Sequence, residues 1–138
     1  MKTIGIIGTR QRDSLLDYRE VRAAFNKVYR EGDIICSGLC PKGGDRFAVI
    51  IADELRLPEE KRLWFPAKWD DLKVLGAVVR YNKWGKPYNT KAGFIRNTDI
   101  ARESDILIAC VSKDRIGGTE DTIEKWKEFH PGKKPILV

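Results

Sequence analysis

Residues 92–110, AGFIRNTDIARESDILIAC, and residues 116–126, IGGTEDTIEKW, carry the pattern that decides the fold of this chain. In the first stretch a segment with helical character leads into the apolar run DILIAC, which has the length and composition of a buried strand. In the second stretch a double glycine opens another helix. Within these two stretches a helix is followed closely by a strand and then by a second helix, as in proteins built from alternating strands and helices. The first helix carries Arg96 and Asn97, and a double glycine opens the second.

The same alternation extends along the rest of the chain. Apolar runs predict strands at residues 3–8, 33–38, 61–65, 105–110 and 134–138. Helical spacing predicts helices from Asp13 or Ser14 to Gly32, over 46–57, over 95–103 and over 117–129. Within residues 67–91, LKVLGAVVRY fits either a helix or a strand, and WGKPYNTKAG fits a loop. We predict an α/β fold: one Rossmann-like, doubly wound domain over residues 1–138, with a mainly parallel sheet of about five strands flanked by helices.

The composition fits a single globular domain with an anionic partner. The chain has 138 residues, of which 42% are hydrophobic and 33% charged, and it contains three cysteines. A small, odd number of cysteines argues against a secreted disulfide scaffold and predicts a cytoplasmic protein. No apolar stretch reaches the about 20 residues of a membrane helix, and the first strand is too short for a signal peptide. The net charge of +6 favours nucleotides or nucleic acid as partners, with a solvated lysine-rich surface as the alternative.

Ligands of doubly wound sheets bind beyond the carboxyl ends of the strands. That rule selects residues 8–10, 37–45, 66–69 and 112–122. Gly43-Gly44 and Gly117-Gly118 each precede a helix, where free N–H groups attract an anion, although tight turns are the alternative reading. Neither G-x-x-x-x-G-K-[ST] nor G-x-G-x-x-G is present, which argues against P-loop ATP hydrolysis and an ordinary NAD dehydrogenase.

Taken together, the motifs in these segments resemble the SLOG superfamily, most of all its YspA/YpsA-related branch. They are GTR at residues 8–10, SGLCPKGGDRFA at 37–48, FPAKW at 65–69, AGFIRN at 92–97 and GGT at 117–119. Wider relatives are the lonely-guy phosphoribohydrolases and the Rossmann core of DNA-processing protein A. The resemblance covers the chain from Gly8 to about Trp126. It implies a Rossmann-like fold that binds a nucleotide or nucleotide-derived ligand, commonly as a homodimer.

The resemblance also implies which residues surround the ribose-phosphate. The predicted ligand-binding residues are Gly8, Thr9, Arg10, Ser37, Gly38, Gly43, Gly44, Asp45, Trp69, Asn97, Gly117, Gly118, Thr119 and Thr122. Lonely-guy enzymes use an arginine, which Arg96 matches, and a glutamate, where this chain has Thr122. Cleavage of an N-glycosidic bond needs a carboxylate. The catalytic candidates are therefore Arg96 together with the neighbouring Asp121 or Glu120.

Other residues leave alternatives open. Residues 70–91 are predicted to form an insert, either a lid whose aromatic residues stack on a base or a dimer contact. Asp45 opens a helix, so a capping role competes with ligand contact. Cys36 and Cys40 lack the further ligands of a zinc site, so we predict neither a metal nor a cofactor.

Three functions follow from these features. The first is nucleotide binding by a sensor, carrier or sequestering protein. The second is hydrolysis of a nucleoside monophosphate by a phosphoribohydrolase. The third is binding of single-stranded nucleic acid, by analogy with DNA-processing protein A and with the positive net charge.

Overall fold

A computed structural model describes all residues, 1–138, and its centre is a five-stranded parallel sheet in the order β3-β2-β1-β6-β7. Every strand pair in this sheet is parallel. The strands are β1 (Thr3–Gly8), β2 (Ile34–Ser37), β3 (Arg62–Trp64), β6 (Ile106–Cys110) and β7 (Ile136–Leu137). This arrangement confirms the predicted Rossmann-like α/β fold, because each parallel pair requires a crossover connection.

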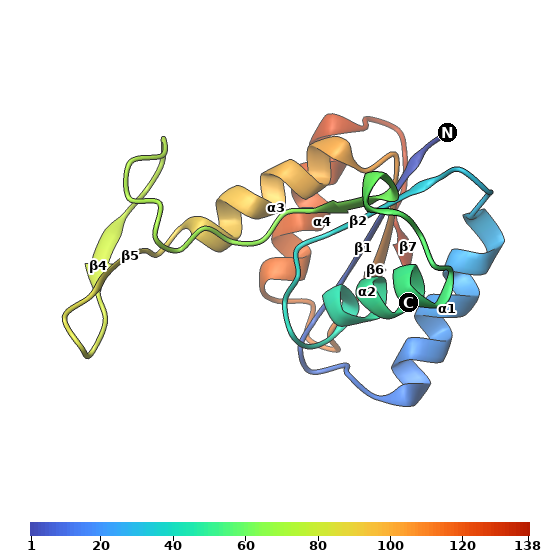
Figure 1. Ribbon diagram of the computed structural model, residues 1–138, viewed down its shortest axis with the longest axis horizontal. Coiled ribbons are helices and arrows are strands. Elements are labelled where there is room, and N and C mark those ends of the chain that lie inside the picture. The colour runs from blue at the N-terminus through green and yellow to red at the C-terminus, as the bar shows by residue number, and fades with distance from the viewer.

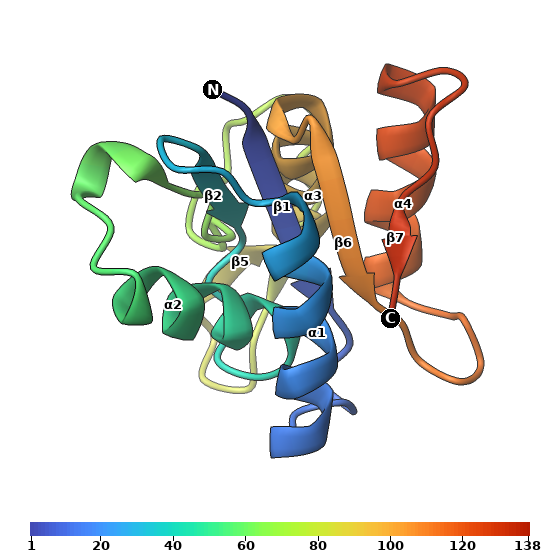
Figure 2. The ribbon, with the colours of Figure 1, turned by 90° about the vertical axis from the view of Figure 1, so that its right-hand side faces the viewer.

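Four α-helices cover the two faces of the sheet (Figures 1 and 2). They are α1 (Leu15–Val28), α2 (Gly44–Glu54), α3 (Ala92–Glu103) and α4 (Gly118–Phe129), with a short 3-10 helix, η1 (Glu59–Lys61), before β3. Apolar residues of α1 and α2 pack with Ile4 and Ile6 in one core cluster, and residues of α3 and α4 pack with Ile7 in the other. The sheet is therefore buried on both faces, which explains its continuous apolar strands.

Helix α1 begins where the sequence predicts but ends earlier than predicted. Ser14 accepts a hydrogen bond from the Asp17 N–H, and the Asp17 side chain accepts one from the Ser14 N–H, so the two form a capping box. The helix ends at Val28 rather than at Gly32, because Tyr29 adopts an extended conformation. Gly32, with φ of 94°, lies instead in the turn that leads into β2.

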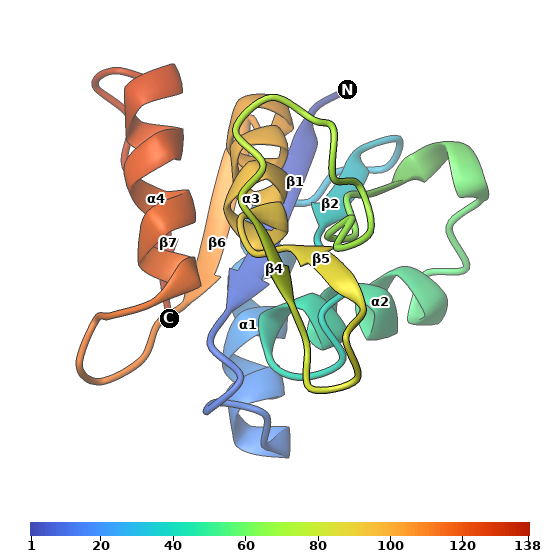
Figure 3. The same cartoon turned by 90° about the vertical axis from the view of Figure 1, so that its left-hand side faces the viewer.

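The ambiguous segment forms a projecting hairpin. The end of LKVLGAVVRY is a strand, one of its two predicted alternatives. The loop predicted for WGKPYNTKAG is wrong, because this stretch contains the second strand of the hairpin and the first residues of α3. Strands β4 (Val79–Tyr81) and β5 (Pro87–Asn89) pair antiparallel in a separate two-stranded sheet. The hairpin extends away from the body of the molecule, beyond the N-terminal end of α3 (Figures 1 and 3). Helix α3 begins at Ala92, before the predicted start at residue 95. No helix in the structure has both the length and the apolar character needed to cross a bilayer.

Candidate functional site

A cavity of about 370 Å³ opens where the strand order reverses, between β1 and β6. From β1 the chain builds β2 and β3 on one side, and it then returns to build β6 and β7 on the other. The loops that leave β1 and β6 therefore diverge, and residues from both loops line the cavity. Helices α3 and α4 supply the remaining walls. This is the position at which doubly wound sheets bind their ligands.

Most of the predicted site residues line this cavity. These are Gly8, Thr9, Arg10, Asp45, Trp69, Arg96, Asn97, Gly117, Gly118, Thr119 and Thr122. Six others lie outside the cavity wall: Ser37, Gly38, Gly43, Gly44, Glu120 and Asp121. The structure thus brings together residues from five separate segments of the sequence.

Arg96 is held at the cavity by two hydrogen bonds that leave part of its guanidinium free. Nη1 donates to the carbonyl oxygen of Gly38 at 2.7 Å, and Nε donates to Asn97 Oδ1 at 3.1 Å. Nη2 makes no hydrogen bond within the chain. Because Nε and Nη1 fix the plane of the group, the N–H donors of Nη2 are oriented in advance for a ligand.

Asn97 connects Arg96 with the start of α4. Its Oδ1 accepts from Arg96, while its Nδ2 lies 3.3 Å from the carbonyl oxygen of Gly118 and 3.2 Å from Asp121 Oδ2. The Asn97 side chain is 8% exposed, so it acts mainly within the protein. Its hydrogen bonds therefore link the Arg96 side chain to the first turn of α4.

The two glycine pairs serve different purposes. A Cβ on Gly44 would lie 2.2 Å from the backbone of Ile7, and one on Gly43 would lie 2.3 Å from the carbonyl oxygen of Thr9. The Gly43 N–H donates to Asp13 Oδ1 at 2.7 Å. This pair therefore lets α2 approach β1 closely. Gly43 and Gly44 do not line the cavity, so their position does not support the prediction that they contact the ligand.

Gly117 and Gly118, by contrast, face open space. Nothing lies within 4 Å of a Cβ built on Gly117, and only Asn97 Nδ2, at 3.8 Å, approaches one on Gly118. Gly117 has φ of 119°, which an L side chain rarely adopts, and no side chain caps the helix that it precedes. The first turn of α4 therefore offers N–H groups at the cavity, as anion sites at helix N-termini do.

Asp45 is buried beside the cavity and does not cap α2. No side-chain hydrogen bond caps that helix; Asp45 Oδ2 instead accepts from the Cys40 N–H at 3.0 Å. Ser37 Oγ lies 2.5 Å from the carbonyl oxygen of Ile6 and 2.9 Å from Asp45 Oδ1. Burial raises the pKa of Asp45, although hydrogen bonds from Cys40 and Ser37 and the charge of Arg96 oppose that effect.

The two carboxylates predicted as catalytic partners are engaged elsewhere. Asp121 Oδ2 accepts from Lys125 Nζ at 2.9 Å and from Asn97, and Glu120 Oε1 accepts from Arg115 Nε at 2.8 Å. Neither residue lines the cavity. Thr122 does line it, but its hydroxyl donates to the carbonyl oxygen of Gly118 at 3.1 Å within α4. Asp45 is thus the one carboxyl side chain in the cavity wall.

Aromatic side chains border the cavity, but they do not come from the tip of the hairpin. Trp69 and Phe94 line it and are 48% and 46% exposed. Trp69 lies against α3, where its Cη2 would be 3.7 Å from a Cβ on Gly93. Tyr81 and Trp84 of the hairpin are far more exposed, and neither lines the cavity. In this structure the insert therefore contributes Thr90, near its base, rather than an aromatic lid.

Sequence reasoning missed several residues of the cavity wall and the arginine that organises the first loop. The additional lining residues are Ile7, Gln11, Cys40, Thr90, Gly93, Phe94, Ile100 and Ile116.

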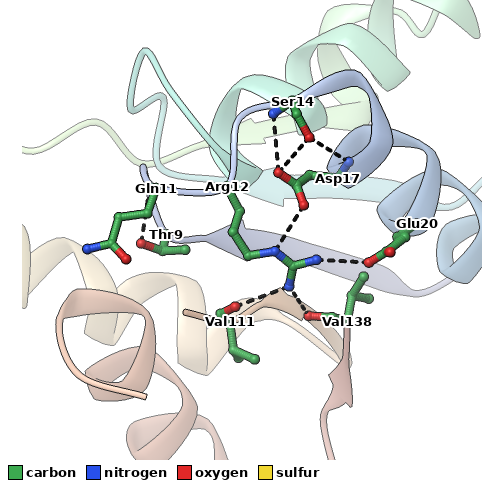
Figure 4. A network of polar contacts seen from close by, with 8 residues as sticks. All are labelled: Thr9, Gln11, Arg12, Ser14, Asp17, Glu20, Val111 and Val138. Carbon is green, nitrogen blue, oxygen red and sulfur yellow. Dashed lines mark hydrogen bonds and ion pairs between the residues drawn. The ribbon is translucent and has the colours of Figure 1, made fainter. Parts of the chain in front are cut away.

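Arg12 donates through Nη1 to the carbonyl oxygens of Val111 and Val138, through Nε to Asp17, and through Nη2 to Glu20 (Figure 4). Arg12 thereby ties the loop after β1, which carries Thr9 and Arg10, to the residue that follows β6. An arginine within a G-T-R-Q-R run was a visible signal for this role.

The cysteines are separate from one another. All three are free, and Cys36 and Cys110 are buried, whereas Cys40 is half-buried in the cavity wall. Burial raises the pKa of Cys36 to about 12 and that of Cys110 to about 11. No group of three or more His, Cys, Asp or Glu side chains is placed to hold a metal ion.

No family model, no curated protein and no solved structure matches this chain. Relationship to the SLOG superfamily therefore rests on the sequence motifs alone and stays a prediction.

Proposed function

We propose that the cavity between β1 and β6 binds a nucleotide or nucleotide-derived ligand through its phosphate group. The observation that carries this proposal is the pairing of two anion-binding features in one cavity. Arg96 presents the unbonded Nη2, and the uncapped first turn of α4 presents backbone N–H groups beside Gly117 and Gly118. Free guanidinium N–H groups and a helix N-terminus each favour phosphate oxygens, and here they meet in one cavity.

The remaining walls suit the rest of a nucleotide. Trp69 and Phe94 present half-exposed rings at the cavity edge, where a planar base can stack. Thr9, Gln11 and Thr90 add hydrogen-bonding groups suited to a ribose. Arg10 also lines the cavity and adds a second positive charge. A protein of this kind acts as a sensor, carrier or sequestering protein.

Hydrolysis of the ligand is less well supported by the geometry. Asp121 accepts hydrogen bonds from Asn97 and Lys125, Glu120 accepts from Arg115, and neither carboxylate lines the cavity. Asp45 lines the cavity, but its oxygens contact Ser37 and the Cys40 N–H. We therefore propose binding rather than N-glycosidic cleavage as the function, with membership of the SLOG superfamily, a cytoplasmic location and a homodimer remaining predictions from the sequence.

The test is a titration of isotope-labelled protein with AMP and, separately, with adenosine, followed through backbone amide resonances. A phosphate at the proposed site shifts the amide signals of Gly118 and Thr119, because these N–H groups gain a charged acceptor. Adenosine, which lacks the phosphate, shifts them much less at the same concentration. If AMP and adenosine give the same amide shifts, or if neither shifts them, the phosphate site is not where we place it.

A further inference from the structure

A second cavity, of about 430 Å³, shares Arg96 with the first. One wall is the segment that leaves β3, with Trp64, Phe65 and Pro66. Another is α3, from which Ala92, Ile95, Arg96 and Asp99 face the cavity at helical spacing. Asn89, at the base of the hairpin that projects toward the viewer in Figure 3, also lines the cavity.

Asn89, at the end of β5, lines this cavity and carries a buried hydrogen-bond donor without a partner. The side chain is 0% exposed. Its Oδ1 accepts from the Val78 N–H at 3.1 Å and from the Lys91 N–H at 3.0 Å. These two donors fix the orientation of the amide, because the opposite orientation would set an NH2 group against two N–H groups. The remaining atom, Nδ2, has no hydrogen-bond partner in the chain.

The charges around the cavity cancel. Lys68 and Arg96 line it, and so do Asp71 and Asp99. Two cations opposed by two carboxylates give no overall preference for an anion or a cation. The first cavity differs, because Arg96 and Arg10 there face only one carboxyl group, that of Asp45. The second cavity is therefore suited to a neutral ligand.

We propose that the second cavity binds a neutral, planar heteroaromatic ring with an exocyclic carbonyl group, whose oxygen accepts from Asn89 Nδ2. The flat apolar walls of Trp64, Phe65 and Pro66 supply the packing surface for such a ring. A buried donor without a partner is costly, so a ligand that supplies the acceptor is favoured over the same ring without it. Oxo-purines and oxo-pyrimidines belong to this class, whether free or as part of a larger molecule. The site needs no phosphate, so it stands independently of the function proposed above.

The first test compares hypoxanthine with purine, which has the same ring system but lacks the carbonyl oxygen. The readout is the proton and nitrogen resonances of the Asn89 side-chain amide, together with the two dissociation constants. We expect hypoxanthine to bind at least about fivefold more tightly than purine and to shift the Asn89 amide protons downfield. Equal affinities with no movement of the Asn89 amide resonances would overturn the proposal.

The second test replaces the donor while keeping the acceptor. In Asn89→Asp, Oδ1 still accepts from Val78 and Lys91, but at about pH 8 the other carboxylate oxygen no longer donates. The matched control is Asn82→Asp, since Asn82 Oδ1 also accepts from two backbone N–H groups, those of Trp84 and Lys86, and lies outside both cavities.

We expect the preference for hypoxanthine over purine to disappear in Asn89→Asp and to persist in Asn82→Asp. A preference that survives in a folded Asn89→Asp protein would assign the carbonyl to another donor and refute the proposal. If that variant does not fold, the comparison of the two rings in the unaltered protein decides the matter by itself.

Discussion

Arg96 Nη1 donates a hydrogen bond to the carbonyl oxygen of Gly38 at 2.7 Å, joining α3 to the loop after β2 across 58 residues of sequence. A Cβ on Gly38 would lie 2.4 Å from that same nitrogen. The glycine is therefore required by the position of the arginine, although it does not itself line the cavity. Gly38 therefore affects the cavity only through the position of Arg96.

Gly38→Ala should weaken ligand binding more than it weakens the fold. The added methyl group displaces the end of a flexible side chain rather than backbone, so we expect the free energy of unfolding to change by less than about 1 kcal/mol. We expect AMP to bind about tenfold more weakly, because Arg96 leaves its fixed orientation. Urea unfolding and calorimetric titration measure the two quantities. A large loss of stability with unchanged affinity would contradict this role for Gly38.

Gly44→Ala and Gly118→Ala should change stability by very different amounts, although both residues are the first residue of a helix. The Gly44 methyl group would collide with the backbone of Ile7, so we expect a loss of at least about 3 kcal/mol in unfolding free energy. The Gly118 methyl group meets nothing closer than 3.8 Å, so we expect a change within about 1 kcal/mol. Urea denaturation of both variants tests the distinction, and equal losses would show that it is wrong.

Asp45→Asn should change how stability depends on pH. Burial raises the pKa of Asp45 in the folded protein above its value in the unfolded chain. The folded state then holds this proton more tightly, so the contribution of Asp45 to stability is complete at low pH and is lost as pH rises through the folded pKa. Asparagine keeps the neutral form at every pH. We therefore expect Asp45→Asn to gain stability relative to the unaltered protein as the pH rises above about 4, the ordinary pKa of an aspartate.

Urea unfolding at a series of pH values checks this prediction. The difference between the two proteins is the useful quantity, because the other carboxylates with shifted pKa values are common to both. A relative stability of Asp45→Asn that falls as pH rises would show that Asp45 is stabilised as a carboxylate instead.

The cysteines should react at very different rates. Cys36 and Cys110 are buried, and their pKa values of about 12 and about 11 keep little reactive thiolate at neutral pH. Cys40 is half-buried in the cavity wall. We expect an alkylating reagent to modify Cys40 alone in the folded protein and all three thiols after denaturation, as read by mass spectrometry. A bound nucleotide should slow the reaction of Cys40; rapid labelling of Cys36 in the folded protein would contradict the structure.

The sequence predicts the fold because each strand of the five-stranded sheet and each α-helix carries its own signal. The apolar run before Gly8, the capping box at Ser14 and the glycines before α4 are local features, and local features set local structure. The hairpin at β4 and β5 carries no such signal. Its short strands lie away from the body of the molecule (Figure 1). They therefore lack the alternation of apolar and polar residues that marks a strand packed on a core.

Part of the site can be predicted from the sequence, and the rest depends on contacts between residues that are distant in the sequence. Motifs identify Arg96, Asn97 and Gly117-Gly118, because a cavity at the switch point uses the ends of strands. Motifs cannot distinguish Gly44, which packs on β1, from Gly118, which faces space, because that difference depends on a neighbour in three dimensions. The engagement of Asp121 by Asn97 and Lys125 is equally invisible in the sequence.

The most direct test of the phosphate site is a calorimetric titration of AMP into the unaltered protein, into Arg96→Met and into Arg102→Met. Arg102 lies on the same helix but pairs with Asp99 and lies outside both cavities, which makes it a matched control. We expect the affinity for AMP to fall at least about tenfold in Arg96→Met and to stay within about twofold in Arg102→Met. Unchanged binding in a folded Arg96→Met protein would contradict the central claim that Arg96 and the start of α4 form a phosphate site.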